Sequence, residues 1–356
     1  MSRITILILL GLFILVSACN AVPPGSTPSP TAAPETTPLP TDTPQPLPTA
    51  TEITPEVILL APPGADPLLV EQMQTRLADF AAELGLSFQV SPELNDADLS
   101  PQVKLVVVLP PDPGVAGLAE AAPETQFLAV SIPGVVAGGN LSTVGANGQR
   151  ADQVAFTAGY LAAAMTPDWR VGVVSALETP AGNSARLGFT NGVYYLCGLC
   201  RSAYPPFPST GWPVVVQLAP GAGQAEWQSA VNDFLTWQVG SVYVAPEVAE
   251  DGLLEELSNA GIHIIGTHPP NPALRENWVA SIQSGDAVEA ALDLLPELLE
   301  GNGGVQVDLP LVLGEVNTDL LSPGRQGLVE TMLVDLLDGY IDTGVDPATG
   351  ESRFSE

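Results

Sequence analysis

The stretch that decides the fold runs from Gln153 to Val174 and reads QVAFTAGYLAAAMTPDWRVGVV. Its first part, up to Met165, is rich in alanine and apolar residues and predicts a helix. Thr166 to Trp169 then form a short turn, and the apolar run that starts at Val171 predicts a buried strand. A helix, a turn and a buried strand in this order are one step of an alternating α/β chain.

The same alternation continues on both sides of this stretch. Before it, strands are predicted at 57–60, 88–90, 105–109, 127–130 and 142–144, with a helix that begins after the N-cap Asp66 and ends before Gly85. From Val171 on, strands are predicted at 171–175, 214–218, 242–245, 263–266 and 311–314, and helices at 182–196, 224–237, 253–260, 286–299 and 328–337. Continuous apolar strands between helices predict parallel sheets covered on both faces, in two doubly wound α/β lobes.

A chain that continues past two complete lobes most often returns to finish each of them. We therefore predict lobe 1 at 57–166 and about 268–305, and lobe 2 at 167–267 and about 306–345. The chain is expected to cross between them near Thr166–Trp169, Gly266–Pro270 and Asn302–Leu309.

The N-terminus predicts export and a membrane anchor. Arg3, an apolar run of about a dozen residues and two small residues make residues 1–18 a signal peptide. Val16-Ser17-Ala18-Cys19 resembles the bacterial lipobox, which implies that Cys19 is acylated. Residues 19–56 then comprise this cysteine and a Pro/Thr-rich linker. We expect an extracytoplasmic protein anchored to the bacterial cell membrane, with an ordinary secreted protein as the alternative.

The charge balance excludes several kinds of partner. The chain has 40 acidic and 10 basic residues and a net charge of −30. Nucleic acids and anionic lipid headgroups are bound by Lys and Arg, so neither is an expected partner. The acids are scattered, as in a solvated surface. Arg186 and Lys104 are the only cations expected near the predicted strand ends, which argues against a strongly anionic ligand.

Cys197 and Cys200 form a C-x-x-C pair near the end of a predicted helix. Outside the cytoplasm a structural disulfide is the default for such a pair. Redox catalysis needs the first cysteine at a helix N-terminus, where its thiol pKa is lowered. We therefore expect a disulfide or inert thiols, with the helix ending or distorting there.

In open parallel sheets, ligands bind beyond the carboxyl ends of the strands. This rule nominates polar residues that follow predicted strands: Asp66, Asp112, Ser131 and Asn147 in lobe 1, and Ser175, Glu178, Glu247, Thr267 and His268 in lobe 2. Asp66 has a second interpretation as a helix cap alone. His268 lies in a Pro-rich loop, which favours exposure at the binding site.

Other features favour structural roles. His263 lies within an apolar strand, and two histidines offer no zinc site. Trp227 and Trp237 are ten residues apart on one helix and are expected to share a packing face, although a stacking platform for a ligand is the alternative. The chain has no G-x-S-x-G, P-loop, H-E-x-x-H or helix-opening G-x-G-x-x-G motif, so we predict no enzyme, no cofactor and no metal.

The segments Ala158–Met165 (AGYLAAAM), Arg170–Val174 (RVGVV) and Gly188–Val193 (GFTNGV) resemble the basic membrane protein family. This family comprises substrate-binding lipoproteins of ABC transporters, with purine-nucleoside receptors as the known type. The resemblance implies a type I periplasmic-binding-protein fold, with two lobes joined by three crossovers. It also implies a small-molecule ligand between the lobes and an ABC permease as partner.

Two loops depart from the pattern of that family. The loop after the first strand, Ala61–Pro67, has no aromatic residue, and His268 stands where an aspartate is expected. We therefore expect a ligand other than a purine nucleoside. A lipoprotein sensor without transport is one alternative function, and a secreted hydrolase, suggested only by the compartment, is another.

The anchor is testable by replacing its cysteine. We predict that the wild-type chain is acylated at Cys19 and stays with membranes, whereas Cys19→Ala sheds into the medium. Fractionation of cells that express each form measures this. A Cys19→Ala chain that remains fully membrane-bound would show that something else anchors the protein.

Overall fold

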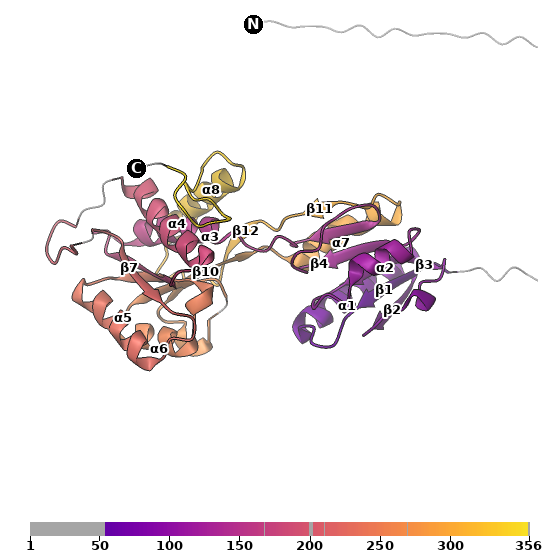
Figure 1. The fold of residues 1–356 in the computed structure, drawn as a ribbon, viewed down its shortest axis with the longest axis horizontal. Helices are drawn as coiled ribbons and strands as arrows, with labels where there is room; N and C mark the ends of the chain where they lie inside the picture. Colours follow the sequence, from indigo (N-terminus) through magenta and orange to yellow (C-terminus); the bar gives the residue numbers. More distant parts are fainter. Residues whose placement is uncertain (1–53, 167, 199–201, 210, 269, 355–356) are drawn as a thin grey trace, which may run out of the picture. The chain divides into compact units, whose positions relative to one another are not determined.

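The computed structural model describes residues 54–166, 168–198, 202–209, 211–268 and 270–354 (Figure 1). The predicted signal peptide, Cys19 and nearly all of the predicted linker lie outside these residues. In the part of the chain that the structure describes, no helix is both long and apolar enough to cross a membrane.

The first lobe is built on a six-stranded sheet with the order β11-β5-β4-β3-β1-β2. Every pair of neighbouring strands in it is parallel. The strands are β1 (Glu56–Leu60), β2 (Ser87–Ser91), β3 (Val103–Val108), β4 (Gln126–Val130), β5 (Leu141–Val144) and β11 (Gln306–Val307). The five strands from β1 to β5 are the five that the sequence predicts for this lobe, and β11 was not predicted.

Both faces of this sheet are covered by helices. Alternate residues of the central strands, such as Val57 and Val107, pack on one side beneath α1 (Pro67–Leu84) and α7 (Ala287–Leu299). Their neighbours, such as Ile58 and Val106, pack on the other side beneath α2 (Val115–Ala121). Because successive residues of a strand point to opposite faces, continuous apolar strands supply both layers.

The second lobe has a six-stranded sheet with the order β12-β10-β9-β8-β6-β7. Its strands are β6 (Val171–Ala176), β7 (Val214–Leu218), β8 (Ser241–Val244), β9 (His263–Gly266), β10 (Trp278–Ser284) and β12 (Leu311–Gly314). They are parallel except for β12, which runs antiparallel to β10. Its helices are α3 (Ala151–Met165), α4 (Pro180–Cys197), α5 (Gln224–Thr236), α6 (Asp251–Asn259) and α8 (Pro323–Leu337). The predicted pair of doubly wound α/β lobes is thus confirmed.

The predicted lobe boundaries need correction at two places. Helix α3 packs into the core of the second lobe, so the chain leaves the first sheet between Val144 and Ala151 rather than near Thr166–Trp169. Strand β10 was not predicted, and because it pairs with β9 and β12 the chain returns to the first lobe only after Ser284. The third crossover lies between β11 and β12, at 308–310, and overlaps the end of the segment predicted for it, Asn302–Leu309.

Helices α3 and α4 are in backbone contact through glycines. A Cβ atom at Gly192 would overlap the carbonyl oxygen of Phe156, and one at Gly159 would overlap that of Phe189. A Cβ at Gly188 would lie 2.5 Å from the carbonyl oxygen of Asp152. No other residue type fits at these positions without moving one helix. The GYLAAAM and GFTNGV segments are therefore the two sides of one helix contact.

This contact predicts opposite effects for two glycine-to-alanine substitutions. Gly192→Ala should lower the free energy of unfolding by about 2 kcal/mol, because its Cβ forces α3 and α4 apart. Gly327→Ala in α8 is the matched control: nothing lies within 4 Å of its Cβ position, so better helix propensity should raise stability by about 0.5 kcal/mol. Urea unfolding of both variants measures the difference. Equal effects of the two substitutions would contradict the close packing.

Candidate functional site

Two of the nominated carboxylates in the first lobe bind backbone N–H groups at helix starts. Asp66 precedes α1, and its Oδ1 accepts a hydrogen bond from the Leu68 backbone N–H at 2.9 Å. Asp112 precedes α2, and its Oδ1 accepts from the backbone N–H groups of Gly114 and Val115 at 2.9 and 3.0 Å. Each carboxylate satisfies N–H groups that a helix start leaves unpaired. The prediction that Asp66 is an N-cap is confirmed.

The carboxyl ends of β4 and β5 meet beside the third crossover. The Ser131 backbone N–H, just past β4, donates to the Val144 carbonyl oxygen at 2.7 Å. A Cβ at Gly145 would lie 3.4 Å from the Ser131 Oγ and 2.8 Å from Leu309 Cδ1. Gly145 also has a φ of +68°, in the left-handed region that favours glycine. A glycine here lets Ser131 and the third crossover lie side by side.

A side-chain hydrogen bond joins the first and third crossovers. The Asn147 Nδ2 donates to the Asp308 Oδ1 at 2.9 Å, and both residues are exposed. The Gln306 side chain also points to this carboxylate, with its Nε2 3.3 Å from the same oxygen. Asn147 was nominated from the sequence, whereas Asp308 was missed because it follows a strand of two residues.

A pocket of about 380 Å³ opens between these crossover segments. Such a volume is at the lower end for a small-molecule site, about 300–1,000 Å³. Most of its polar groups come from the first crossover and the start of α3, and its apolar groups come from the third crossover and α8. We call it the crossover pocket; it is lined by Asn147, Gly148, Gln149, Arg150, Gln153, Asp308, Leu309, Pro310, Leu311 and Leu337.

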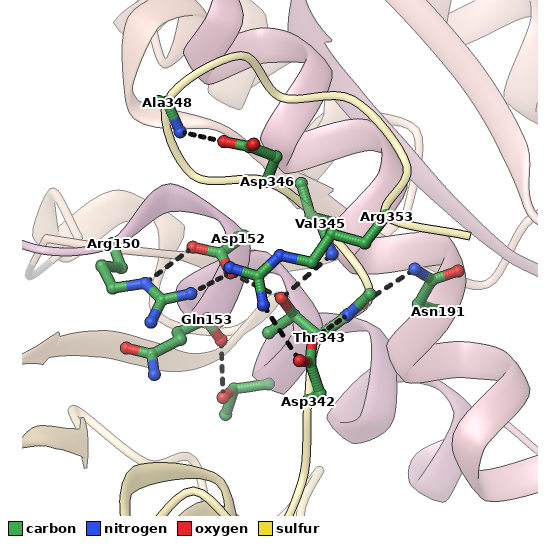
Figure 2. Close-up of polar contacts among 12 residues, drawn as sticks. Arg150, Asp152, Gln153, Asn191, Asp342, Thr343, Val345, Asp346, Ala348 and Arg353 are labelled. Atoms are coloured by element: carbon green, nitrogen blue, oxygen red, sulfur yellow. Dashed lines mark hydrogen bonds and ion pairs between the residues drawn. The ribbon is translucent and has the colours of Figure 1, made fainter. Parts of the chain in front are cut away.

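A buried carboxylate orients the cation of this pocket (Figure 2). The Arg150 Nε and Nη2 donate to the two carboxylate oxygens of Asp152 at 3.1 and 2.6 Å. The Thr343 Oγ1, in the C-terminal segment, donates to Asp152 Oδ2 at 2.6 Å, and Asn191 on α4 donates to the Thr343 carbonyl oxygen at 2.8 Å. The Asp152 side chain is fully buried, whereas that of Arg150 is 45% exposed. The buried Asp152 carboxylate thus fixes the orientation of the Arg150 guanidinium, while the exposed part of the Arg150 side chain lines the crossover pocket.

Arg150 corrects one expectation from the sequence. Arg186 and Lys104 are not the only cations near the strand ends, because Arg150 lines the crossover pocket. Lys104 is the second residue of β3, so it lies toward the amino end of that strand. The sequence feature that could have indicated Arg150 is the Arg-x-Asp pair at the start of a helix. The pair alone does not show that Asp152 is buried, because the hydroxyl that completes the hydrogen bonds of Asp152 belongs to Thr343, 191 residues away in the sequence.

In the second lobe, the hydroxyl group of Ser175 lies buried near the carboxyl end of β6. The side chain is fully buried, and its Oγ has no hydrogen-bond partner among the described residues. Two residues beyond β6 lies Glu178, which is exposed and has a φ of +57°. Glu247 is exposed in a short 3₁₀ turn after β8 (Pro246–Val248). A buried hydroxyl without a partner is costly, which marks Ser175 as the nominated residue that most needs an explanation.

Thr267 and His268 form a connected group with the end of β10. The Thr267 Oγ1 lies 2.9 Å from the Nδ1 of His268, whose ring is exposed. The Ser281 Oγ donates to the His268 carbonyl oxygen at 2.8 Å and accepts from the Trp278 Nε1 at 3.2 Å. A Cβ at Gly266 would overlap the Trp278 ring. The loop that carries His268 is therefore fixed by a strand that the sequence did not predict.

The remaining aromatic and histidine residues have packing roles. The Trp227 ring lies between α5 and α6, where a Cβ at Gly252 would overlap it. Trp227 and Trp237 both pack against the core of the second lobe, as expected. His263 begins β9 and is partly buried, and burial lowers the pKa of its imidazole.

Helix α4 ends at Cys197, followed by Gly198 as its C-cap. Cys197 is disulfide-bonded. The other two cysteines of the chain, Cys19 and Cys200, lie outside the described residues, so the pairing of Cys197 with Cys200 stays a prediction. Within the described residues, no group of three or more His, Cys, Asp or Glu side chains is arranged to hold a metal ion.

The structure thus brings some of the nominated residues together and leaves others apart. Ser131 and Asn147 follow the neighbouring strands β4 and β5, and the Asn147 side chain binds Asp308 at the third crossover, whereas Thr267 contacts His268. Asp66 caps α1 and Asp112 binds backbone N–H groups before α2, whereas Glu178 and Glu247 stand exposed in separate loops. Of the nominated residues, Asn147 is the one that lines the crossover pocket.

This architecture matches solved proteins. A solute-binding protein of an ABC transporter system from Conexibacter woesei DSM 14684 has a TM-score of 0.53 and 15% identity, over 81% of this chain and 98% of that one. A transcriptional activator of the comK gene from Bacillus halodurans has a TM-score of 0.49 and 14% identity, over 81% and 99%. A solute-binding protein from Aeropyrum pernix K1 has a TM-score of 0.43 and 15% identity, over 83% and 84%.

The first of these likenesses shows the fold: the chain has a type I periplasmic-binding-protein-like architecture, as predicted. Identities of this size carry neither a ligand nor a partner over to this chain. No protein-family model and no curated protein matches the sequence.

The unpartnered Ser175 hydroxyl predicts an unusual result for a buried substitution. Ser175→Ala should raise the unfolding free energy of the ligand-free chain by about 1 kcal/mol, because it removes a buried hydroxyl that has no hydrogen-bond partner among the described residues. Ser281→Ala, the same change at a fully buried position of the same sheet, should cost about 2 kcal/mol because it leaves the Trp278 N–H and the His268 carbonyl unpaired. Denaturant unfolding compares the two. Equal losses would mean that Ser175 has a structural partner.

Proposed function

We propose that this chain is a lipid-anchored extracytoplasmic solute-binding protein that captures a small polar ligand for an ABC-type importer. The observation that carries the proposal is the pair of doubly wound sheets joined by three crossovers, with a polar pocket at the crossovers. A fold shared with a named solute-binding protein supports it. The lipobox-like Cys19 segment and the Pro/Thr-rich linker supply the tether.

The charges around the crossover pocket favour a ligand without strong negative charge. The Arg150 guanidinium is paired with the buried Asp152, and Asp308 adds an exposed carboxylate on the other side of the pocket. An anionic ligand would have to compete with Asp152 for the guanidinium and meet the Asp308 carboxylate. The amides of Asn147 and Gln153 and the free guanidinium N–H groups suit hydroxyl and amide groups.

The same residues favour a ligand that is not a purine nucleoside. A purine base is held by an aromatic face, and none of the nominated strand-end residues is a Phe, Tyr or Trp. Trp227, the one ring considered as a platform, is committed to packing against Gly252. Binding through hydrogen bonds to hydroxyl, amide or ammonium groups is what the site offers.

A thermal-shift panel of nucleosides, sugars, amino acids and polyamines tests this proposal. We expect the largest stabilisation from an uncharged polyol or an amino acid, and none at micromolar concentrations from phosphates or dicarboxylates. The shift should be lost in Asn147→Leu, which removes the amide from the crossover pocket, and kept in Asn95→Leu, at an exposed loop position. If adenosine or guanosine gave the largest shift in the melting temperature, the chain would instead be a nucleoside receptor and this proposal for the ligand would be wrong.

A further inference from the structure

One stretch of the chain lacks the charge that dominates the rest. From Thr179 to Ala225 there is no Asp or Glu in 47 residues, although the whole chain has one acid in about nine residues and would place about five there. The stretch comprises α4, the loop that follows it and β7. A stretch of this length without a carboxylate is unusual in a chain whose net charge is −30.

Exposed aromatic rings gather on this acid-free stretch. Tyr204 is 75% exposed, Phe207 58%, Tyr195 55% and Tyr194 43%. The Tyr194 hydroxyl donates to the carbonyl oxygen of Trp212 at 2.6 Å, which ties the end of α4 to the end of the following loop. We call Tyr194, Tyr195, Tyr204 and Phe207 the aromatic surface.

A buried arginine holds this surface in place. The Arg170 side chain, 7% exposed, donates to the carbonyl oxygen of Tyr204 at 2.6 Å and to those of Pro205 and Pro206 at 3.3 and 3.4 Å. Its guanidinium carbon lies 5.6 Å from the centre of the Trp212 ring. The same guanidinium binds the carboxylate of Asp168 at 2.6 Å. The loop that presents Tyr204 and Phe207 is therefore fixed by a cation with several bonds.

The composition of the aromatic surface is that of an interface core, and its area is about half of what one partner contributes. Its four rings expose on the order of 450 Å², taking about 200 Å² for each whole side chain. One partner in a standard protein interface contributes about 800 Å², so the rings supply roughly half of that area. Enrichment in aromatic residues with depletion of Asp and Glu is the composition of interface cores.

The distribution of charge on this chain indicates which kind of protein can bind the aromatic surface. A basic protein would be attracted to the acidic faces of this chain and not to the one stretch without acids. An acidic protein would be repelled by those faces, and the acid-free stretch offers it the least repulsion. We propose that the aromatic surface binds a second copy of this chain, in a symmetric dimer that brings two molecules of net charge −30 together through their acid-free stretches, beside the Asp168 carboxylate that Arg170 neutralises.

Sedimentation equilibrium of the full chain with Cys19→Ser tests this proposal, because that change removes acyl chains and a reactive thiol from the measurement. The dimer fraction should rise from low micromolar to about 200 µM protein, and it should rise further at about 1 M salt, where charge repulsion is screened. The double variant Tyr204→Ser/Phe207→Ser should weaken the dimer at least about tenfold. At a concentration where the wild type is monomeric, the thermal midpoint of this variant should equal that of the wild type, since both side chains are exposed.

Tyr340→Ser is the matched control. This ring is 81% exposed but lies between Asp338 and Asp342, outside the acid-free stretch, so its loss should not change the dimer. A monomer at every concentration and salt would overturn the proposal. So would a dimer that is indifferent to Tyr204 and Phe207. Binding of a monomeric chain to lipid vesicles through these two rings would assign the surface to a membrane and equally overturn the dimer.

Discussion

The contact between α3 and α4 is the constraint on which the rest of the second lobe depends. Three glycines replace side chains at this contact, so the two helices meet backbone to backbone. Their separation is then fixed by the van der Waals radii of carbonyl oxygens rather than by rotamers, which leaves little freedom. One end of the pair sets the position of Arg150 at the crossover pocket, and the other end presents Tyr194 beside its loop. The pocket and the aromatic surface are thus held by one rigid element.

Much of the fold could be predicted because the strands of parallel sheets have a clear pattern of apolar residues in the sequence. Strands buried on both faces, such as Val103–Val108, read as continuous apolar runs, and the helix α1 is marked by Asp66 and Gly85 at its two ends. Strand β10 was missed because Ser281, Gln283 and Ser284 interrupt the apolar pattern, and the hydrogen bonds of Ser281 are visible only in the fold. The first crossover was misplaced because Thr166–Trp169 reads as a break between domains, whereas it is a turn within one lobe.

The sequence predicts which loops carry the candidate residues, but it only partly predicts what each of these residues does. The strand-end rule finds loops that meet at one edge of each sheet, because topology alone brings them there. The rule cannot distinguish residues that bind backbone N–H groups at helix starts from residues that line a pocket. Asp66 and Asp112 are of the first kind, and Asn147 is of the second. Asp152 illustrates the limit most clearly. Nothing within a few residues of it shows that its carboxylate is buried or that a hydroxyl near the end of the chain completes its hydrogen bonds.

That last hydrogen bond has a consequence for how the protein matures. The first lobe needs β11, near residue 306, to complete its sheet, and the second needs Thr343 to satisfy a carboxylate on its first helix. Neither lobe can reach its final state while the C-terminal part of the chain is still being synthesised or translocated. Folding is thereby delayed until the polypeptide is whole, which suits a protein expected to cross a membrane unfolded. A product terminated before residue 343 would leave the buried Asp152 carboxylate without the Thr343 hydroxyl, and its second lobe would be less stable.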